Sequence, residues 1–329
     1  MNSIQIQTQM LDDQLDVQEL AHLTFELWKI TRPEASASIE GIGNWIKNLV
    51  FDEVPVIVKA YKVEKLVGWI LLFVHDSKKL EVNPWALGGH PHILPEEPKR
   101  LEIVQLLLKE CINYALQNDH TRIELCYEKI DSVEKYPVDP SVYPKCNLME
   151  EDEIVFMSLN LADQKLPEVE FPKGIETILL KNAADDDLYT CFYDSFSESG
   201  DRNFLSETDE EREEYFEEHF DKEDEMIDDA SIVLVDRTKF IGFTLVKPTH
   251  GEGNGHLWIM GVIPKYRGRQ LGSKLLHHAI VTLRNSGYKT MSLVVDSDNE
   301  AALKLYEKYN FIKGWRRITH AWKKRHIAV

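Results

Sequence analysis

The two halves of the chain repeat each other, and this repetition constrains the fold more than any other feature of the sequence. Residues 65–69 (KLVGW) return in similar form at residues 239–243 (KFIGF), where a short charged turn again leads into an apolar strand. Residues 142–148 (VYPKCNL) likewise return at residues 305–311 (LYEKYNF), and in each half an amphipathic helix and a strand lie between the two matches. Matches in the same order at a long period predict two copies of one mixed α/β domain rather than a solenoid. The alternative is that strand–turn–strand patterns of this kind recur in any α/β protein.

The expected domain boundaries follow from the length and from one proline-containing segment. A chain of 329 residues suits two domains of about 150 residues each. Residues 161–174 (LADQKLPEVEFPKG) contain two prolines and a glycine and show no sustained apolar period, which is typical of a linker. We therefore expect an N-terminal domain at residues 1–160, a linker at 161–174 and a C-terminal domain at 175–329.

The composition is that of a soluble globular protein. With 43% hydrophobic and 29% charged residues, the chain is unlike disordered, collagen-like or disulfide-dense proteins. Its net charge of −18 argues against nucleic acid as a partner, since phosphate backbones are bound by clustered lysine and arginine. The sequence shows neither a secretion signal nor an apolar stretch of about 20 residues, so no membrane association is expected. The chain has four cysteines, Cys111, Cys126, Cys146 and Cys191. Their spacing is not of the zinc type, so we expect no metal site and no disulfides. This cysteine usage predicts a cytoplasmic location. Oligomeric state cannot be predicted from these features.

Residues 256–283 predict an anion-binding site. Residues 256–263 (HLWIMGVI) are typical of a buried strand, which Pro264 ends because proline lacks an N–H. Residues 266–273 (YRGRQLGS) form a basic loop with two glycines, and residues 274–283 have helical apolar spacing. This order brings free backbone N–H groups and the positive end of a helix dipole together, which stabilises an anion and most naturally a phosphate. Taken alone, the loop can also be a glycine turn with two solvated arginines.

The same residues resemble a known family. Residues 262–272 (VIPKYRGRQLG) resemble the acyl-CoA-binding signature V-x-P-x-x-R-G-x-G-x-G/A of the GNAT superfamily of N-acetyltransferases. Residues 299–311 (NEAALKLYEKYNF) are similar to the N-x-x-A-x-x-x-Y-x-x-x-G-F segment of that family. The resemblance covers about residues 175–329 and reaches the N-terminal half only through the repetition. It implies a tandem GNAT protein with two α/β domains, each a twisted central mixed sheet flanked by helices.

Two positions depart from the family pattern. Gln270 stands where the signature has its middle glycine, so a side chain lies where the backbone that faces the pyrophosphate is usually bare. Asn310 replaces the glycine before Phe311, and asparagine accepts left-handed backbone geometry more readily than most residues. The change at Gln270 can weaken or reorient the bound acyl-CoA.

The resemblance assigns acetyl-CoA as co-substrate and implies its contacts. Backbone groups of Met260, Gly261 and Val262 would contact the pantetheine and the acyl carbonyl. The pyrophosphate would lie against the backbone amides of Arg267, Gly268, Arg269, Gln270, Leu271, Gly272 and Ser273. Asn299 matches the residue that contacts the amide arm, and Tyr306 matches the residue that protonates the departing thiolate. From the residues alone, Asn299 can equally be a helix N-cap and Tyr306 a core aromatic.

A general base is expected near the central strand, because direct transfer needs a free amine as nucleophile. His256 begins that strand, and an unperturbed pKa near 6.5 suits a histidine for this role at neutral pH. A surface histidine at the entrance of a strand is the alternative. Glu252 and His250, beside the preceding glycine-rich turn, are weaker candidates.

An acidic stretch at residues 207–229 is predicted to form an amphipathic helix, because Tyr215, Phe216 and Phe220 are interleaved with its carboxylates. In the GNAT fold this region walls the acceptor site, so these carboxylates can attract a polyamine, an aminoglycoside or a basic peptide. The alternative is a solvated helix face.

The N-terminal half lacks the signature. Residues 85–104 (WALGGHPHILPEEPKRLEIV) take the place of the phosphate loop and contain no R-G-x-G-x-G, although Gly88 and Gly89 can form an anion nest. Tyr143 aligns with Tyr306 but precedes Pro144, and it is not expected to be catalytic. This half is therefore expected to be a degenerate, non-catalytic copy.

The sequence thus predicts an acyltransferase. The expected reaction transfers an acetyl group from acetyl-CoA to a primary amine of a small molecule, directly and within a ternary complex. Tandem members of the family acylate small amines, and this analogy of fold favours a small acceptor. Two alternatives are a protein or peptide N-acetyltransferase and a catalytically silent acyl-CoA sensor, the latter because of Gln270.

Overall fold

The chain forms two compact units, which we describe separately. The computed structural model describes residues 3–11, 15–33, 36–49, 53–76, 78–84, 87–129, 138–164, 166–199, 201, 204–205, 207–222, 225–249 and 253–324. The first unit comprises Met1–Glu153 together with Arg316–Val329, and the second comprises Ile154–Trp315. Among the described helices, none is both long enough and apolar enough to cross a membrane.

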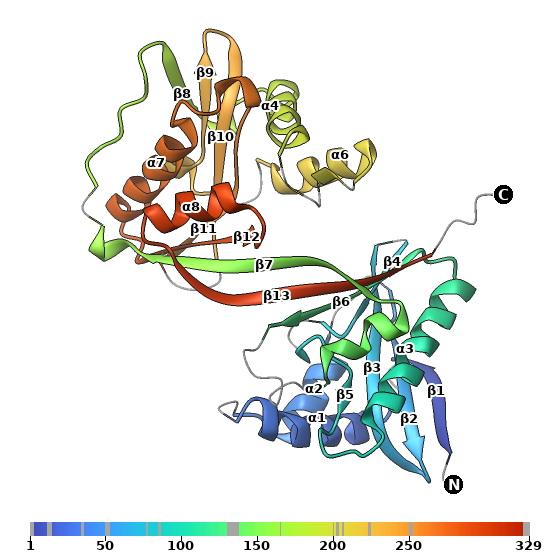
Figure 1. Ribbon diagram of the computed structural model, residues 1–329. Helices are drawn as coiled ribbons and strands as arrows, with labels where there is room; N and C mark the ends of the chain where they lie inside the picture. The colour runs from blue at the N-terminus through green and yellow to red at the C-terminus, as the bar shows by residue number, and fades with distance from the viewer. Residues whose placement is uncertain are drawn as a thin grey trace, which may run out of the picture. The chain divides into compact units, whose positions relative to one another are not determined.

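The first unit is a mixed sheet with helices on both faces (Figure 1). Its sheet has the order β1-β2-β3-β4-β6-β13, in which only the β4–β6 pair is parallel. The elements are β1 (Ile4–Met10), α1 (Gln18–Thr31), α2 (Ile39–Lys47), β2 (Val56–Lys62), β3 (Lys65–Asp76), β4 (Lys79–Val82), β5 (His92–Ile93), α3 (Arg100–Gln117), β6 (Arg122–Glu128), η3 (Pro140–Val142) and η4 (Pro144–Cys146). Side chains of alternate strand residues, such as Ile123, Leu125 and Tyr127, pack in one core with α3, while α1 and α2 cover a second core.

The second unit has the same strand order and directions. Its sheet runs β8-β9-β10-β11-β12-β7, and only the β11–β12 pair is parallel. The elements are η5 (Leu161–Asp163), β8 (Ile175–Leu179), η6 (Leu180–Asn182), α4 (Asp185–Ser197), α6 (Asp209–His219), η7 (Asp228–Ala230), β9 (Ile232–Asp236), β10 (Lys239–Pro248), β11 (Asn254–Val262), η8 (Pro264–Tyr266), α7 (Leu271–Asn285), β12 (Thr290–Asp296) and α8 (Glu300–Lys308). Six strands in one shared topology confirm the two-copy α/β fold that the repetition predicted.

Each unit takes its last strand from the other half of the sequence. Residues 154–160 of β7 (Met149–Asn160) pair with β12, although they belong to the N-terminal half. Residues 317–323 of β13 (Ile312–Lys323) pair with β6, although they lie near the C-terminus. The units therefore differ from the expected boundaries of 1–160 and 175–329, because apolar periodicity marks a strand without marking its partner.

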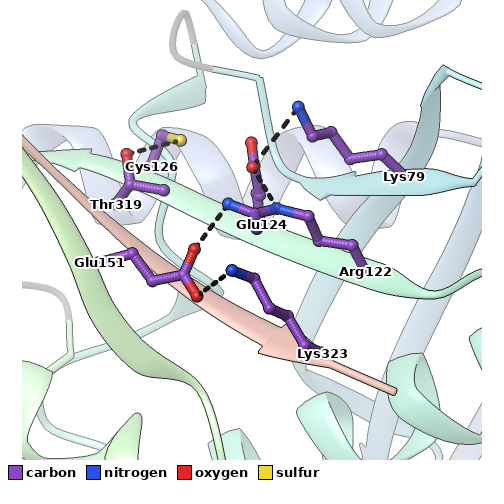
Figure 2. A network of polar contacts seen from close by, with 7 residues as sticks. All are labelled: Lys79, Arg122, Glu124, Cys126, Glu151, Thr319 and Lys323. Carbon is purple, nitrogen blue, oxygen red and sulfur yellow. Dashed lines mark hydrogen bonds and ion pairs between the residues drawn. The ribbon is translucent and has the colours of Figure 1, made fainter. Parts of the chain in front are cut away.

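The exchanged strand β13 is also held by side chains in the first unit (Figure 2). Lys323 lies 2.9 Å from Glu151, which in turn accepts a hydrogen bond of 2.6 Å from Arg122. The Arg122 side chain also binds Glu124, at 2.6 Å, and the Cys126 thiol lies 3.5 Å from the Thr319 hydroxyl. The network thus joins β13 to β6 and to the first part of β7.

Residues 161–174 do not link the two units. They lie inside the second unit, where their described carbonyl groups accept hydrogen bonds from side chains of α7. Lys274 donates to Glu170 at 2.6 Å, and Arg284 donates to Gln164 at 2.9 Å. The prolines of this segment therefore mark an irregular strap along a helix rather than a domain boundary.

Candidate functional site

The sheet of the second unit opens between its two parallel strands. Residues 254–257 of β11 pair with residues 290–293 of β12, but β11 continues to Val262 and β12 to Asp296. Both strands stay paired on their outer edges, with Gly242 opposite Val262 and Ile154 opposite Asp296. The described β11–β12 pairing thus ends at Leu257 and Leu293, so the inner backbone edges of residues 258–262 and 294–295 are not paired with each other and can pair with a ligand.

A β-bulge lies where the opening begins. In the β10–β11 pair, Leu245 is opposite Ile259 and Val246 is opposite Leu257, so Trp258 is the extra residue. Bulges bend a strand and redirect a side chain, and they occur often beside active sites. From the sequence, residues 256–263 were expected to form one regular buried strand, and the bulge at Trp258 was not predicted.

The expected contact residues Met260, Gly261 and Val262 form the edge of β11 along the opening. Gly261 is required by packing, because a Cβ atom there would lie 2.8 Å from Cβ of Ser195 on α4 and 2.9 Å from the ring of Phe243. The absence of a side chain lets α4 approach β11 closely.

The loop after β11 ends at the positive pole of α7. Gly268 has a φ of +74° with no heavy atom within 4 Å of a Cβ position, and the nearest atom to one on Gly272 is Val262 Cγ2 at 3.9 Å. The amides of Leu271, Gly272 and Ser273 are in the first turn of α7 and lack intrahelical acceptors. A row of backbone amides beside small residues is the arrangement that the sequence predicted for a pyrophosphate site, and the binding of that group stays a prediction.

Arg267 has a structural role that the sequence did not predict. Its guanidinium donates to the carbonyl oxygens of Ser195 at 2.7 Å, Glu198 at 3.1 Å and Val262 at 3.1 Å. Its backbone N–H donates to Pro264 at 3.1 Å, so the row of amides open to a ligand starts at Gly268. This arginine fastens the end of α4 to the loop, whereas Arg269 lies over the ring of Tyr266 at 4.7 Å.

Gln270 and Asn310 both adopt left-handed backbone conformations. The φ angles are 62° at Gln270 and 65° at Asn310, a region that glycine adopts most readily. Gln270 is the N-cap residue of α7, and its side chain makes no capping hydrogen bond. The local backbone is preserved at both positions, with some strain at the glutamine.

Tyr306 is buried on α8, in the core cluster against which Met260 packs. Burial raises the pKa of its phenol to about 12, so the hydroxyl is protonated across the physiological range. Its ring lies 5.7 Å from that of Phe311. The structure thus shows Tyr306 as a core aromatic, and its role as a proton donor stays a prediction.

Asn299 is the N-cap of α8. Its side-chain oxygen accepts a hydrogen bond of 3.1 Å from the backbone N–H of Ala302. The cap uses the oxygen only, and the NH₂ group of Asn299 keeps its donors for another acceptor. The two roles considered from the sequence are therefore compatible.

His256 belongs to a chain of hydrogen-bonded side chains at the base of the opening. Its Nδ1 lies 2.9 Å from the hydroxyl of Ser292, which also accepts a hydrogen bond of 3.0 Å from Asn254. Thr290 donates to the amide oxygen of Asn254 at 2.8 Å. Burial lowers the pKa of His256, which favours its neutral form. The sequence did not identify Ser292, because only the β11–β12 register brings it beside His256; Asn254 lies two residues before His256 on the same strand. His250 and Glu252 lie outside the described residues.

The acidic stretch contains a shorter helix than expected. Helix α6 covers Asp209–His219 and begins with a capping box formed by Thr208 and Glu211. Phe216 and Phe220 are buried, which confirms the predicted apolar side. The ring of His219, at the end of α6, lies 5.3 Å from that of Trp258.

In the first unit, the chain itself fills the place that corresponds to the opening. Glu81 is opposite Glu124 in the β4–β6 register, as His256 is opposite Ser292 in β11–β12. Beyond that point Gly89 lies so close to β6 that a Cβ atom would be 1.7 Å from the carbonyl oxygen of Cys126. The side chain of Asn83 fixes the segment by donating to the His90 carbonyl at 2.6 Å.

Two further observations concern expectations about the first unit and metals. Tyr143 is fully buried, and its hydroxyl lies 2.6 Å from Nδ1 of His90. Within the described ranges, no group of three or more histidine, cysteine, aspartate or glutamate side chains is arranged to hold a metal ion.

Comparisons with known proteins agree with this geometry. The model of the Acetyltransferase (GNAT) family matches residues 187–311. A mycothiol acetyltransferase from Saccharopolyspora erythraea is 27% identical over 157 residues, which are 46% of this chain and 48% of the relative. A second one, from Mycobacterium sp. (strain JLS), is 40% identical over 77 residues, 22% of this chain and 25% of the relative. N-alpha-acetyltransferase 30 from Schizosaccharomyces pombe is 29% identical over 86 residues, 25% of this chain and 57% of that protein. The chain thus spans a quarter to somewhat over half of the length of these relatives.

Solved structures extend the likeness of fold to both units. A GCN5-related N-acetyltransferase from Sphaerobacter thermophilus has a TM-score of 0.61 at 17% identity, over 97% of this chain and 95% of that one. A tandem GNAT protein from the clavulanic acid biosynthesis pathway has a TM-score of 0.55 at 14% identity, over 98% of both chains. At such identities the likeness concerns the fold alone. Residues 187–311 are thus similar to the acetyltransferase (GNAT) family, and across both units the fold is like that of a tandem GNAT protein.

Proposed function

We propose that this protein is an N-acetyltransferase that transfers an acetyl group from acetyl-CoA to a primary amine of a small molecule, directly and within a ternary complex. The observation that carries the proposal is the opening between β11 and β12, which leads to the exposed amides at the start of α7. Similarity to mycothiol acetyltransferases supports a small acceptor.

The second unit would hold acetyl-CoA through its backbone. Amides from Gly268 to Ser273 would donate to the pyrophosphate, and the free edge of Met260, Gly261 and Val262 would pair with the pantetheine arm. The NH₂ group of Asn299 would contact the same arm. Bound acetyl-CoA supplies the activated acetyl thioester, and the residues around it determine orientation and proton transfer.

His256 would take the proton from the acceptor ammonium. If its Nδ1–H donates to Ser292, the second ring nitrogen is left bare and can accept a proton. The lowered pKa of His256 keeps this nitrogen in the basic form at neutral pH. Ser292 and Asn254 would thus act as positioning residues.

Tyr306 would give a proton to the departing thiolate. We expect Tyr306→Phe to lower kcat by about a hundredfold or more, while the dissociation constant for acetyl-CoA changes little. A thiol-release assay and calorimetric titration with acetyl-CoA measure the two quantities. Equal losses in turnover and in affinity would contradict the role of proton donor, and Tyr288→Phe, at a tyrosine that packs against the same core cluster, is the matched control.

The overall proposal is tested by thiol release from acetyl-CoA across a panel of primary amines. We expect saturable turnover with at least one small amine, and substitution of His256 by glutamine should abolish most of it. Tight binding of acetyl-CoA without turnover on any amine would instead favour the silent acyl-CoA sensor, which the strained Gln270 makes a specific alternative.

A second candidate is acetylation of a peptide N-terminus. The match to N-alpha-acetyltransferase 30 favours it, and the acidic surface of α6 would suit a basic peptide. Peptides included in the same panel distinguish the two acceptors.

We also propose that the first unit is a non-catalytic copy. Its own residues 88–92 occupy the position beside β6 that corresponds to the opening in the second unit. Calorimetry should then give one acetyl-CoA per chain. The cytoplasmic location remains a prediction, which cell fractionation would test.

A further inference from the structure

The face of the sheet that carries His256 has exposed apolar side chains where the opening begins, and the Lys247 ammonium lies there, 5.3 Å from the centre of the Trp258 ring. Met291, Leu293 and Val295 of β12 point into the core beneath α7 and α8, so Ser292 and Val294 face the opposite side. On β7 the same alternation places Phe156 beside Val294, its register partner. Figure 1 shows α7 and α8 on one side of this sheet and α4 and α6 on the other.

Trp258 lies on the same face as His256. Its ring is 5.7 Å from that of His256 and 5.3 Å from that of His219 on α6. Trp258 and Val294 are each 41% exposed, although their neighbours Leu257 and Leu293 are almost fully buried. The two exposed side chains border the opening from β11 and from β12.

The apolar row continues away from the opening. Phe156 is partly buried and stacks on Trp315, with ring centroids 5.1 Å apart and an angle of 13° between the planes. We call Trp258, Val294 and Phe156 the apolar platform. It adjoins the hydrogen-bonded side chains of Thr290, Asn254, Ser292 and His256. Two residues further along each strand, from His256 to Trp258 and from Ser292 to Val294, the side chains on this face become apolar.

A set of hydrogen-bonding side chains around His256 and the apolar platform meet at the proposed site of transfer. An amine must reach His256, and whatever carries that amine must lie over the exposed indole and valine, because the opening begins between them. A sugar or a polyamine would place polar atoms on this surface and lose their hydration. A flat or branched apolar group would instead remove the platform from water.

We propose that the acceptor is a primary amine carrying an aromatic or branched aliphatic body, which lies on the apolar platform while the amine faces His256. This inference rests on the proposed acetyl transfer and names its substrate class. The carboxylates of α6 favour the approach of the acceptor as an ammonium ion.

The test compares amines that differ in their body, with kcat/KM expressed per concentration of free amine so that differences in ammonium acidity do not enter. The measured quantity is kcat/KM by thiol release for 2-phenylethylamine and 3-methylbutylamine against 2-methoxyethylamine. We expect a preference of about tenfold or more for the two apolar amines. Trp258→Ala and Val294→Ser should each reduce this preference to within about threefold, while the KM for acetyl-CoA stays unchanged.

Control variants separate the platform from general effects. Trp258→Phe keeps an aromatic surface and should retain most of the preference, which guards against loss of folding in the alanine variant. Ile312→Ser changes a side chain of β13 that is 71% exposed and outside the platform, and the preference should not change.

The outcomes distinguish the inference from the function on which it rests. Equal kcat/KM for apolar and polar amines would overturn the inference and leave acetyl transfer standing. Binding of acetyl-CoA without turnover on any amine would overturn both. Turnover restricted to peptides with an apolar first residue would support the platform and overturn the small-molecule acceptor.

Discussion

Single residues in this protein carry roles that depend on a neighbour in another strand. The proposed role of His256 is the clearest example, because which ring nitrogen would accept a proton depends on the one that Ser292 contacts. The histidine could be selected from the sequence by its position before a buried strand. Its partner Ser292 could not be predicted, since the pairing of β11 with β12 is a long-range contact that residue order does not encode.

The pH dependence of kcat should reveal the state of His256. Burial lowers its pKa below the ordinary 6.5, and the reaction needs the neutral ring, so kcat should fall only as the pH drops through this lower value. His256→Gln should remove this acidic limb and reduce kcat by roughly a hundredfold. His278→Gln is a matched control, because His278 on α7 also has a lowered pKa and lies outside the site. An unchanged limb in His256→Gln would assign the base to another residue.

Gln270 offers a test of backbone strain. A left-handed conformation costs a residue with a Cβ atom about 1 kcal/mol, which glycine avoids. We therefore expect Gln270→Gly to raise the free energy of unfolding of the second unit by up to about 1 kcal/mol. Urea denaturation measures the change, and Gln270→Ala, which keeps the Cβ atom, should give no gain. Destabilisation by glycine would show that the glutamine side chain stabilises the loop.

At the scale of elements, the end of helix α4 and the loop before α7 behave as one piece. Arg267 joins them through carbonyl groups of Ser195 and Glu198, which lie at the negative end of the α4 dipole. The family pattern placed this arginine at an anion, whereas its side chain serves the packing of α4. Residue type alone could not separate the two roles, since a guanidinium can donate hydrogen bonds to carbonyl as well as to phosphate oxygens.

Hydrogen exchange can measure this connection. Arg267→Ala should speed exchange of the amides at residues 195–199 by roughly tenfold, the equivalent of one hydrogen bond to a charged group. Arg269→Ala removes the same charge from the same loop without touching α4, so exchange at residues 195–199 should stay as it is. Similar acceleration in both variants would point to charge rather than to the hydrogen bonds.

At the scale of the whole molecule, the sequence predicted the architecture but not the division of the chain. Two repeated segments were enough to predict two copies of one α/β fold, because alternation and helical spacing are local signals. The exchange of β7 and β13 could not be predicted, since either strand carries the apolar pattern that either sheet requires. Residues 161–174 were predicted as a linker because of their prolines, but they lie within the second unit.

The exchange predicts a particular effect of truncation. A chain that ends after Phe311 lacks β13 entirely, and the first unit then loses the strand beside β6. We expect its structure to suffer although residues 1–153 are intact, with faster amide exchange in β6 than in β2. A matched truncation after residue 324 removes only residues outside the described part and should leave both strands protected. Equal protection of β6 in both chains would contradict the expectation.

This exchange also sets the order of events on the ribosome. The first unit has most of its strands soon after residue 128 emerges, yet β6, already paired with β4, lacks its second neighbour until residue 323 has been made. The second unit, by contrast, already has β7 at hand when its own strands appear. Although synthesis runs from the N-terminus, the first unit is thus completed after the second. Its sheet is complete only once β13 has been made.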